Sequence, residues 1–163
     1  MKSSTKQPAK NYAALAGFVA VCLAAGFFGS LVTAPRIPTW YASLEKPAGN
    51  PPSWVFAPVW TTLYILMAVA AWLVWRRVPS LRTPPLVWFW MQLALNTIWS
   101  LIFFGLERPG LALLDIGLLW LAIAVTITVF RRFSGTAALL LSPYLAWVTF
   151  AAYLNFGIWR LNP

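Results

Sequence analysis

Residues 109–130 read PGLALLDIGLLWLAIAVTITVF, a run in which Asp115 is the only charged residue. A helix needs about 20 apolar residues to cross the hydrocarbon core of a bilayer. Because no water inside the bilayer can bond the backbone N–H and C=O groups, such a run must satisfy them internally, which favours a helix. The run therefore predicts a membrane-spanning helix.

Four more apolar runs of similar length lie on either side of this one, at residues 12–33, 54–75, 85–106 and 135–159. Hydrophobic residues make up 61% of the chain and charged residues 9%, against about 25% charged in an ordinary soluble domain. This composition excludes a separate soluble domain. We predict an all-α membrane protein, a single domain over residues 1–163, in which five transmembrane helices form a bundle.

The composition also excludes several classes of function. The net charge is +9, but the basic residues lie in short connections and tails instead of on one face, so we expect no nucleic-acid partner. Histidine, the usual metal ligand and near-neutral acid or base, is absent, and Asp115 is the only one of three acids inside a span. We therefore expect no metal site and no cofactor, and histidine-dependent hydrolysis is disfavoured.

The basic residues predict the orientation in the membrane. With five crossings, the side of the N-terminus holds Lys2, Lys6, Lys10, Arg76, Arg77, Arg82, Arg131 and Arg132, and the opposite side holds Arg36, Lys46, Arg108 and Arg160. Because Lys and Arg are enriched in cytoplasmic loops, the N-terminus is expected in the cytoplasm if the protein resides in a cytoplasmic membrane. An outer membrane voids this inference, so both bacterial membranes stay open for this multi-pass protein.

The connection at residues 34–53 is much longer than the others. It contains five prolines together with Trp40 and Tyr41. A connection of this length is usually functional or disordered. Its aromatic content and the stiffness of proline favour a structured loop that caps the bundle.

Residues spaced three or four apart form a stripe on one face of each helix in four of the runs, and most of them are polar or aromatic. The stripes are Trp60, Tyr64 and Met67; Gln92, Asn96, Trp99 and Phe103; Leu111, Asp115 and Leu118; and Tyr144, Trp147, Ala151 and Asn155. The direction of the chain places these stripes towards the side of residues 34–53. Two interpretations stay open: a pocket beneath the cap, or polar side chains that simply bond one helix to another.

Asp115 is a candidate functional residue, because an ionisable group inside a membrane is costly and rarely kept without a role. It lies about 9 Å beyond Pro109 along the helix, and this shallow position also permits a structural role. We expect its carboxylate to pair with Arg36, Lys46 or Arg160, or to accept a hydrogen bond from a tryptophan.

Several short motifs occur in order along the chain. They are Trp40-Tyr41 with Lys46-Pro47, WVFAPVWT at 54–61, QLALN at 92–96 followed by Trp99, and PYLAW at 143–147 followed by Leu154-Asn155. Together they resemble the translocator protein family, also called tryptophan-rich sensory proteins or TspO, over roughly residues 40–162.

This resemblance implies five helices, frequent homodimers, and binding of porphyrins, notably protoporphyrin IX, with cholesterol and drug ligands in some members. It implies a pocket beneath the first loop, with Trp147, Trp60 and Asn96 as the first candidates for its lining. The full predicted ligand site is Trp40, Trp54, Trp60, Tyr64, Asn96, Trp99, Leu111, Asp115, Trp147, Ala151 and Asn155.

Three functions follow as hypotheses. The first is a carrier, sensor or regulator of tetrapyrroles; the missing histidine favours a metal-free porphyrin over haem. The second, implied by the resemblance, is light-dependent porphyrin degradation through radicals on Trp147, with Trp40 or Trp54 assisting. Gly49 weakens it, because the family often has an aromatic residue there. The third is a structural or regulatory membrane partner.

Overall fold

A computed structural model describes residues 6–163, with side chains described from residue 11 onward. The long helices are α1 (Lys6–Arg36), α2 (Phe56–Trp75), α3 (Pro84–Ser100), α4 (Pro109–Phe133) and α5 (Gly135–Leu161). Three single turns complete them: the π-helical turns η1 (Ile37–Tyr41) and η3 (Leu101–Gly105), and the 3-10 turn η2 (Ser53–Val55). Five helical segments are long and apolar enough to cross a membrane, and residues 6–163 contain no strand. The predicted all-α, five-helix fold is confirmed.

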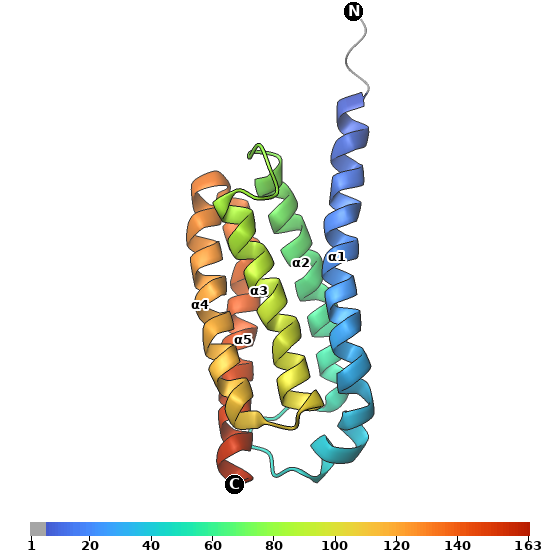
Figure 1. Ribbon diagram of the computed structural model, residues 1–163, viewed down its shortest axis with the longest axis vertical. Coiled ribbons are helices and arrows are strands. Elements are labelled where there is room, and N and C mark those ends of the chain that lie inside the picture. Colours follow the sequence, from blue (N-terminus) through green and yellow to red (C-terminus); the bar gives the residue numbers. More distant parts are fainter. Residues whose placement is uncertain (1–5) are drawn as a thin grey trace, which may run out of the picture.

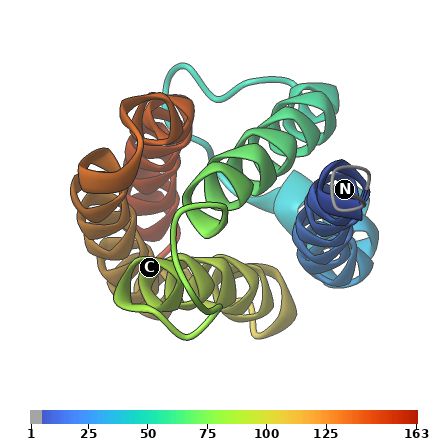
Figure 2. The same ribbon diagram turned by 90° about the horizontal axis from the view of Figure 1, so that it is seen from above.

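The helices form a closed ring (Figures 1 and 2). Around it, α1 packs on α2, α2 on α5, α5 on α4, α4 on α3, and α3 returns to α1. The start of α1 and the end of α5 lie at opposite ends of the bundle, as an odd number of crossings requires (Figure 1). Chain order and ring order therefore differ, and α2 and α5 become neighbours although two helices separate them in the sequence.

The long connection starts later than expected. Residues 34–53 were predicted as one loop, but α1 continues through Pro35 to Arg36, η1 follows directly, and helical structure ends only at residue 43. The Thr39 hydroxyl donates to the Pro35 carbonyl at 2.9 Å, so a side chain provides a hydrogen bond to a backbone carbonyl at this turn. The irregular part is residues 44–52, and we call residues 34–52 the cap.

Local signals explain the helix starts. Proline stands in the first turn of α3 and of α4, where its missing N–H has no intrahelical partner to lose. Ser134 alone separates α4 from α5, and its Oγ accepts the Ala137 N–H at 3.2 Å. This one-residue connection makes α4 and α5 antiparallel neighbours.

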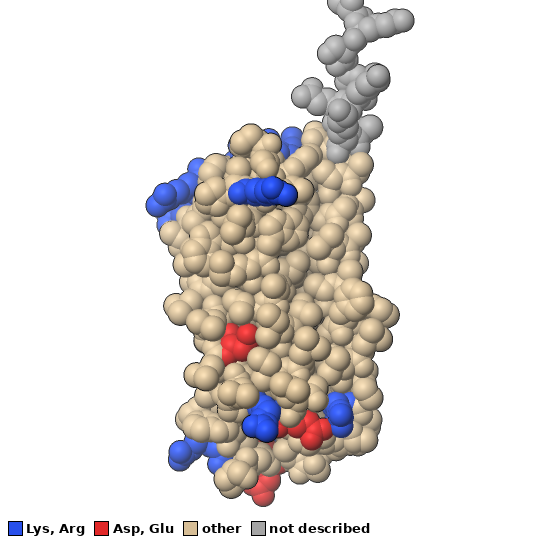
Figure 3. All heavy atoms as spheres, in the orientation of Figure 1, with Lys and Arg blue, Asp and Glu red and all other residues tan. Residues whose placement is uncertain are grey.

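The bundle has two different halves along its axis. The half at the ends of α2 and α4, which we call the packed half, is filled by rings such as Phe18 and Trp90, stacked at 5.7 Å, and Phe89 and Phe130, stacked at 6.3 Å. The other half, which we call the cap half, carries the cap. Lys and Arg gather at the two ends, and the broad middle band in Figure 3 shows no basic residue. Lys2 and the side chains of Lys6 and Lys10, counted in the orientation prediction, lie outside the described part.

Candidate ligand-binding cavity

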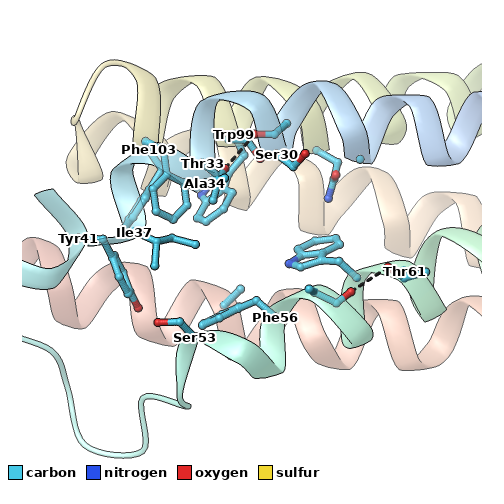
Figure 4. A pocket seen from close by; sticks show the side chains of 18 of the residues that line it. Ser30, Thr33, Ala34, Ile37, Tyr41, Ser53, Phe56, Thr61, Trp99 and Phe103 are labelled. Carbon is cyan, nitrogen blue, oxygen red and sulfur yellow. Dashed lines mark hydrogen bonds between the residues drawn. The ribbon is translucent and has the colours of Figure 1, made fainter. Parts of the chain in front are cut away.

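The cap half encloses a cavity of about 450 Å³. Its lining comes from α1, α2, α3 and α5 and from the three single turns, and none of it from α4. Figure 4 shows residues of α1 and η1, such as Thr33 and Ile37, facing Phe56 and Thr61 of α2 across the open space. Sites for small molecules are usually about 300–1,000 Å³ in volume, so the cavity is large enough for one.

Small residues bring the helices together around this cavity. A Cβ added to Gly26 of α1 would lie 2.5 Å from the Tyr64 ring, and one added to Gly29 would lie 3.2 Å from the Ser100 Oγ. Glycine therefore lets α1 approach both α2 and α3. The ring of helices closes at these two contacts. Larger side chains line the cavity but do not fill it.

Aromatic rings form much of the wall and hold one another in place. Trp99 stacks on Phe103 with 4.9 Å between the ring centroids, and Trp60 lies 5.7 Å from Tyr64. Trp147 meets Phe56 edge to face at 6.1 Å. Such offset and edge-to-face contacts are the favoured arrangements of aromatic pairs. The cavity therefore offers fixed aromatic surfaces.

Two buried asparagines tie the walls together. The Tyr64 hydroxyl donates to the Asn96 Oδ1, which joins α2 to α3. The Trp99 indole N–H donates to the Asn155 Oδ1 at 3.0 Å, and the Asn155 amide donates to the Pro109 carbonyl at 2.8 Å. These side chains both line the cavity and bond helix to helix, so the two interpretations left open by the sequence hold together.

One polar group on the wall has no protein partner. The Trp147 indole nitrogen is buried and makes no hydrogen bond within the described part of the chain. An indole N–H can only donate, and a buried donor without an acceptor costs about 1–3 kcal/mol. Because protein atoms cover this nitrogen, it is an unsatisfied donor within the wall, and Trp147 contributes its aromatic surface to the cavity.

The cap closes the end of the cavity and is fastened to α5. The Asn162 side chain accepts from the Glu45 N–H and donates to the Glu45 carbonyl, both at 3.0 Å. Tyr153 donates to the Ala48 carbonyl at 3.0 Å. A Cβ on Gly157 would lie 2.6 Å from Pro47, so only glycine allows the cap this close to α5.

The cap is also held against η3. Trp40 meets Phe103 and Phe104 edge to face at 5.5 and 6.2 Å, and Arg36 pairs with Glu107 at 2.7 Å. Tyr41 lies in the lining next to Ser53 at the closed end (Figure 4). The predicted structured cap is therefore present, with contacts on both sides of the cavity.

The cavity opens sideways. Those lining residues that are also exposed come only from α1, from η2 and from the first two turns of α2: Leu23, Phe27, Ser30, Ala34, Ser53, Ala57 and Thr61. The mouth therefore lies between α1 and α2, on the side of the bundle.

Seven of the residues predicted for the ligand site lie in the cavity wall: Trp60, Tyr64, Asn96, Trp99, Trp147, Ala151 and Asn155. Trp40, Trp54, Leu111 and Asp115 do not. Trp40 packs against Phe103, which is itself part of the lining, and Trp54 is 74% exposed. Leu111 and Asp115 belong to α4, which contributes no residue to the cavity lining; Leu111 is exposed and Asp115 is buried.

Asp115 does not form the pair expected from the sequence. It is buried, one carboxylate oxygen has no partner within residues 6–163, and Arg36 is paired with Glu107 instead. The expectation was wrong because it was based on the depth of Asp115 along α4 and not on the side of α4 that carries this residue.

The predicted site contained no residue of α1, although Gly26, Gly29 and Ser30 line the cavity from that helix. It also omitted Phe56, and it omitted Phe103 although Phe103 shares a helix face with Asn96 and Trp99. The small residues spaced three or four apart on α1 were the available signal for a close approach, but such spacing is common in membrane helices.

Comparison with known proteins agrees with this architecture. The sequence profile of the TspO/MBR family matches residues 18–160. The chain is 46% identical to the tryptophan-rich protein TspO of Chlorobaculum tepidum over 159 residues, which cover 94% of this chain and 99% of that protein. It is 40% identical to the translocator protein of Ovis aries over 149 residues, covering 90% and 88%. It is also 40% identical to a tryptophan-rich sensory protein of Cereibacter sphaeroides over 154 residues, covering 93% of each.

Proposed function

Because this chain belongs to the TspO/MBR family, we propose that it binds a metal-free porphyrin in the cavity beneath the cap and serves as a tetrapyrrole carrier or sensor. The chain is an integral, multi-pass membrane protein. The observation that supports the proposal most is a cavity with aromatic walls that opens between α1 and α2 on the side of the bundle. A flat, hydrophobic molecule is the ligand that such a space suits.

The wall chemistry narrows the ligand class. None of the described lining residues is Lys, Arg, Asp or Glu. An ionised group buried there without a partner would be costly, so a ligand must place an apolar body inside and keep any carboxylates at the mouth. A porphyrin ring with its acidic side chains on one edge fits this division.

The chemistry available to a metal also favours the metal-free ring. The chain has no histidine, and the single cysteine, Cys22, is buried and absent from the lining. Histidine and cysteine are the usual protein ligands of haem iron. The remaining contacts are mainly aromatic faces, which suit the ring itself.

The binding proposal is tested by titrating the purified protein with protoporphyrin IX while following tryptophan fluorescence. Replacing Trp60 or Trp147 by Leu removes an aromatic face and should weaken binding between about twofold and tenfold, since such contacts contribute about 0.5–1.5 kcal/mol. The matched control is Trp159→Leu, on α5 but outside the cavity. Equal affinities for all four proteins would contradict the assignment of the cavity.

Carrying and sensing are distinguished by a second experiment. Vesicles loaded with an acceptor protein for porphyrin are prepared with and without the reconstituted protein, and porphyrin arrival inside is followed by fluorescence. A carrier accelerates arrival, and at porphyrin concentrations below saturation the acceleration is smaller in Trp147→Leu. A sensor binds saturably and leaves the rate of arrival unchanged.

A further inference from the structure

The end of the bundle farthest from the cavity carries an unusual concentration of positive charge. Arg76, Arg77 and Arg82 lie in the connection between α2 and α3, and Arg131 and Arg132 lie in the last turn of α4. All five are exposed. The three acids of the whole chain are Glu45, Glu107 and Asp115, and none belongs to these segments.

A specific contact gathers these arginines. The Arg77 guanidinium donates to the backbone carbonyl of Phe133, which joins the α2–α3 connection to the end of α4. This bond brings Arg77 next to the last turn of α4, which carries Arg131 and Arg132. We call Arg77, Arg131 and Arg132 the arginine cluster.

At the opposite end of the bundle, basic residues lie near acidic ones. There Arg36 is paired with Glu107 at 2.7 Å, and Glu45 belongs to the cap near Lys46. Basic and acidic groups are mixed at the lower end of Figure 3, whereas the upper end shows only basic ones among the coloured residues. The arginine cluster therefore lacks the protein counter-charge that the cap end has.

Tryptophans fix the depth of the cluster in the membrane. Trp72 and Trp88 lie in the turns of α2 and α3 that adjoin it, and tryptophan is enriched where acyl chains meet headgroups. The Arg76 guanidinium lies over the Trp72 ring, 4.8 Å from its centroid. The cluster is thus at the level of lipid headgroups.

We propose that the arginine cluster is a binding site for the headgroup phosphate of an anionic phospholipid. A guanidinium binds a phosphate through two parallel hydrogen bonds, and neighbouring arginines favour a headgroup with net negative charge over a zwitterionic one. Lipid is the source to which the placement commits, because the tryptophans put these side chains at the bilayer surface. This site is independent of the cavity and of the ligand proposed for it.

The test is native mass spectrometry of the full chain in detergent, titrated with phosphatidylglycerol or with phosphatidylcholine of the same acyl chains. The protein should bind phosphatidylglycerol more tightly. Basic residues near an anionic surface contribute about fivefold each in affinity. Arg131→Gln with Arg132→Gln should therefore weaken phosphatidylglycerol binding roughly 25-fold and leave phosphatidylcholine binding unchanged. Arg77 is not substituted, because its guanidinium also bonds the Phe133 carbonyl and joins the α2–α3 connection to α4.

The matched control removes two charges at the other end, Arg108→Gln with Arg160→Gln, and should leave phosphatidylglycerol binding intact. Arg131→Lys with Arg132→Lys should retain most of the affinity, which excludes misfolding as the cause of loss. Equal binding of the two lipids by the unaltered protein would overturn the proposal. So would equal losses in the two Gln double variants, or displacement of the lipid by millimolar inorganic phosphate.

Discussion

The packed half and the cap half are built from the same kinds of residue, yet side chains fill the interior of the packed half and leave a cavity in the cap half. In the packed half, Phe18 from α1 inserts between Trp75, Phe89 and Trp90 and is 5% exposed. In the cap half, α1 lines the cavity with small residues such as Gly26 and Gly29 and with Leu23 and Phe27, which are exposed at the mouth. Aromatic content alone therefore does not decide between core and cavity; in the packed half, a buried ring of α1 fills the space between the other helices.

The largest effect is expected from enlarging α1 where it meets α2. Gly26→Leu forces side-chain atoms against the Tyr64 ring, which Asn96 holds in place, and should lower the free energy of unfolding by about 3 kcal/mol. The control is Gly17→Leu, because a Cβ there meets nothing within 4 Å. Denaturant unfolding in detergent checks both. Equal stability of the two variants would show that α1 is not in close contact with α2.

A smaller loss is expected at the buried bond between α2 and α3. Tyr64→Phe removes the hydroxyl and leaves the buried Asn96 oxygen without its donor, which should cost about 1–2 kcal/mol. Tyr153→Phe removes an exposed hydroxyl and should cost less. The same unfolding measurement compares them; an equal cost for both would mean that the Asn96 bond is solvated.

The fastening of the cap is tested by Asn162→Ala, which removes both hydrogen bonds to Glu45. We expect a loss of about 1 kcal/mol, confined to the cap. Hydrogen exchange of residues 44–48 should accelerate about fivefold while the interior of α3 is unchanged. Uniform acceleration over the whole bundle would contradict a local fastening.

The smallest effect is expected for Arg36→Gln, since this ion pair is exposed and such pairs contribute less than about 1 kcal/mol. Exchange of residues 44–48 should rise less than in Asn162→Ala, and the difference should shrink at high salt. A larger effect than that of Asn162→Ala would assign the cap mainly to its charge pair.

The sequence predicts the fold well because lipid imposes it. A long apolar run has few options in a bilayer, so all five helices and most of their ends follow from run length and proline positions. The exceptions are local: α1 continues through Pro35, and α3 ends in a π-helical turn. Both features depend on which neighbouring groups form hydrogen bonds with the backbone at these turns. The sequence of a single apolar run does not contain that information.

The cavity is predicted less completely, for a geometric reason. Periodicity finds which residues share a face, and it placed Trp60, Asn96 and Trp147 correctly in one wall. It does not show which helices border the cavity. Leu111 and Asp115 satisfied the spacing rule on α4, a helix of the ring that contributes no residue to the cavity lining.

The most direct test is to fill the cavity from one helix and to add the same bulk outside it. Ala151→Phe places a ring in the cavity wall of α5, and Ala146→Phe places one on an exposed position of the same helix. In protoporphyrin IX titrations, Ala151→Phe should abolish binding and Ala146→Phe should bind like the unaltered protein. Unimpaired binding by Ala151→Phe, with both variants folded by circular dichroism, would contradict a ligand site in the hollow half of the bundle.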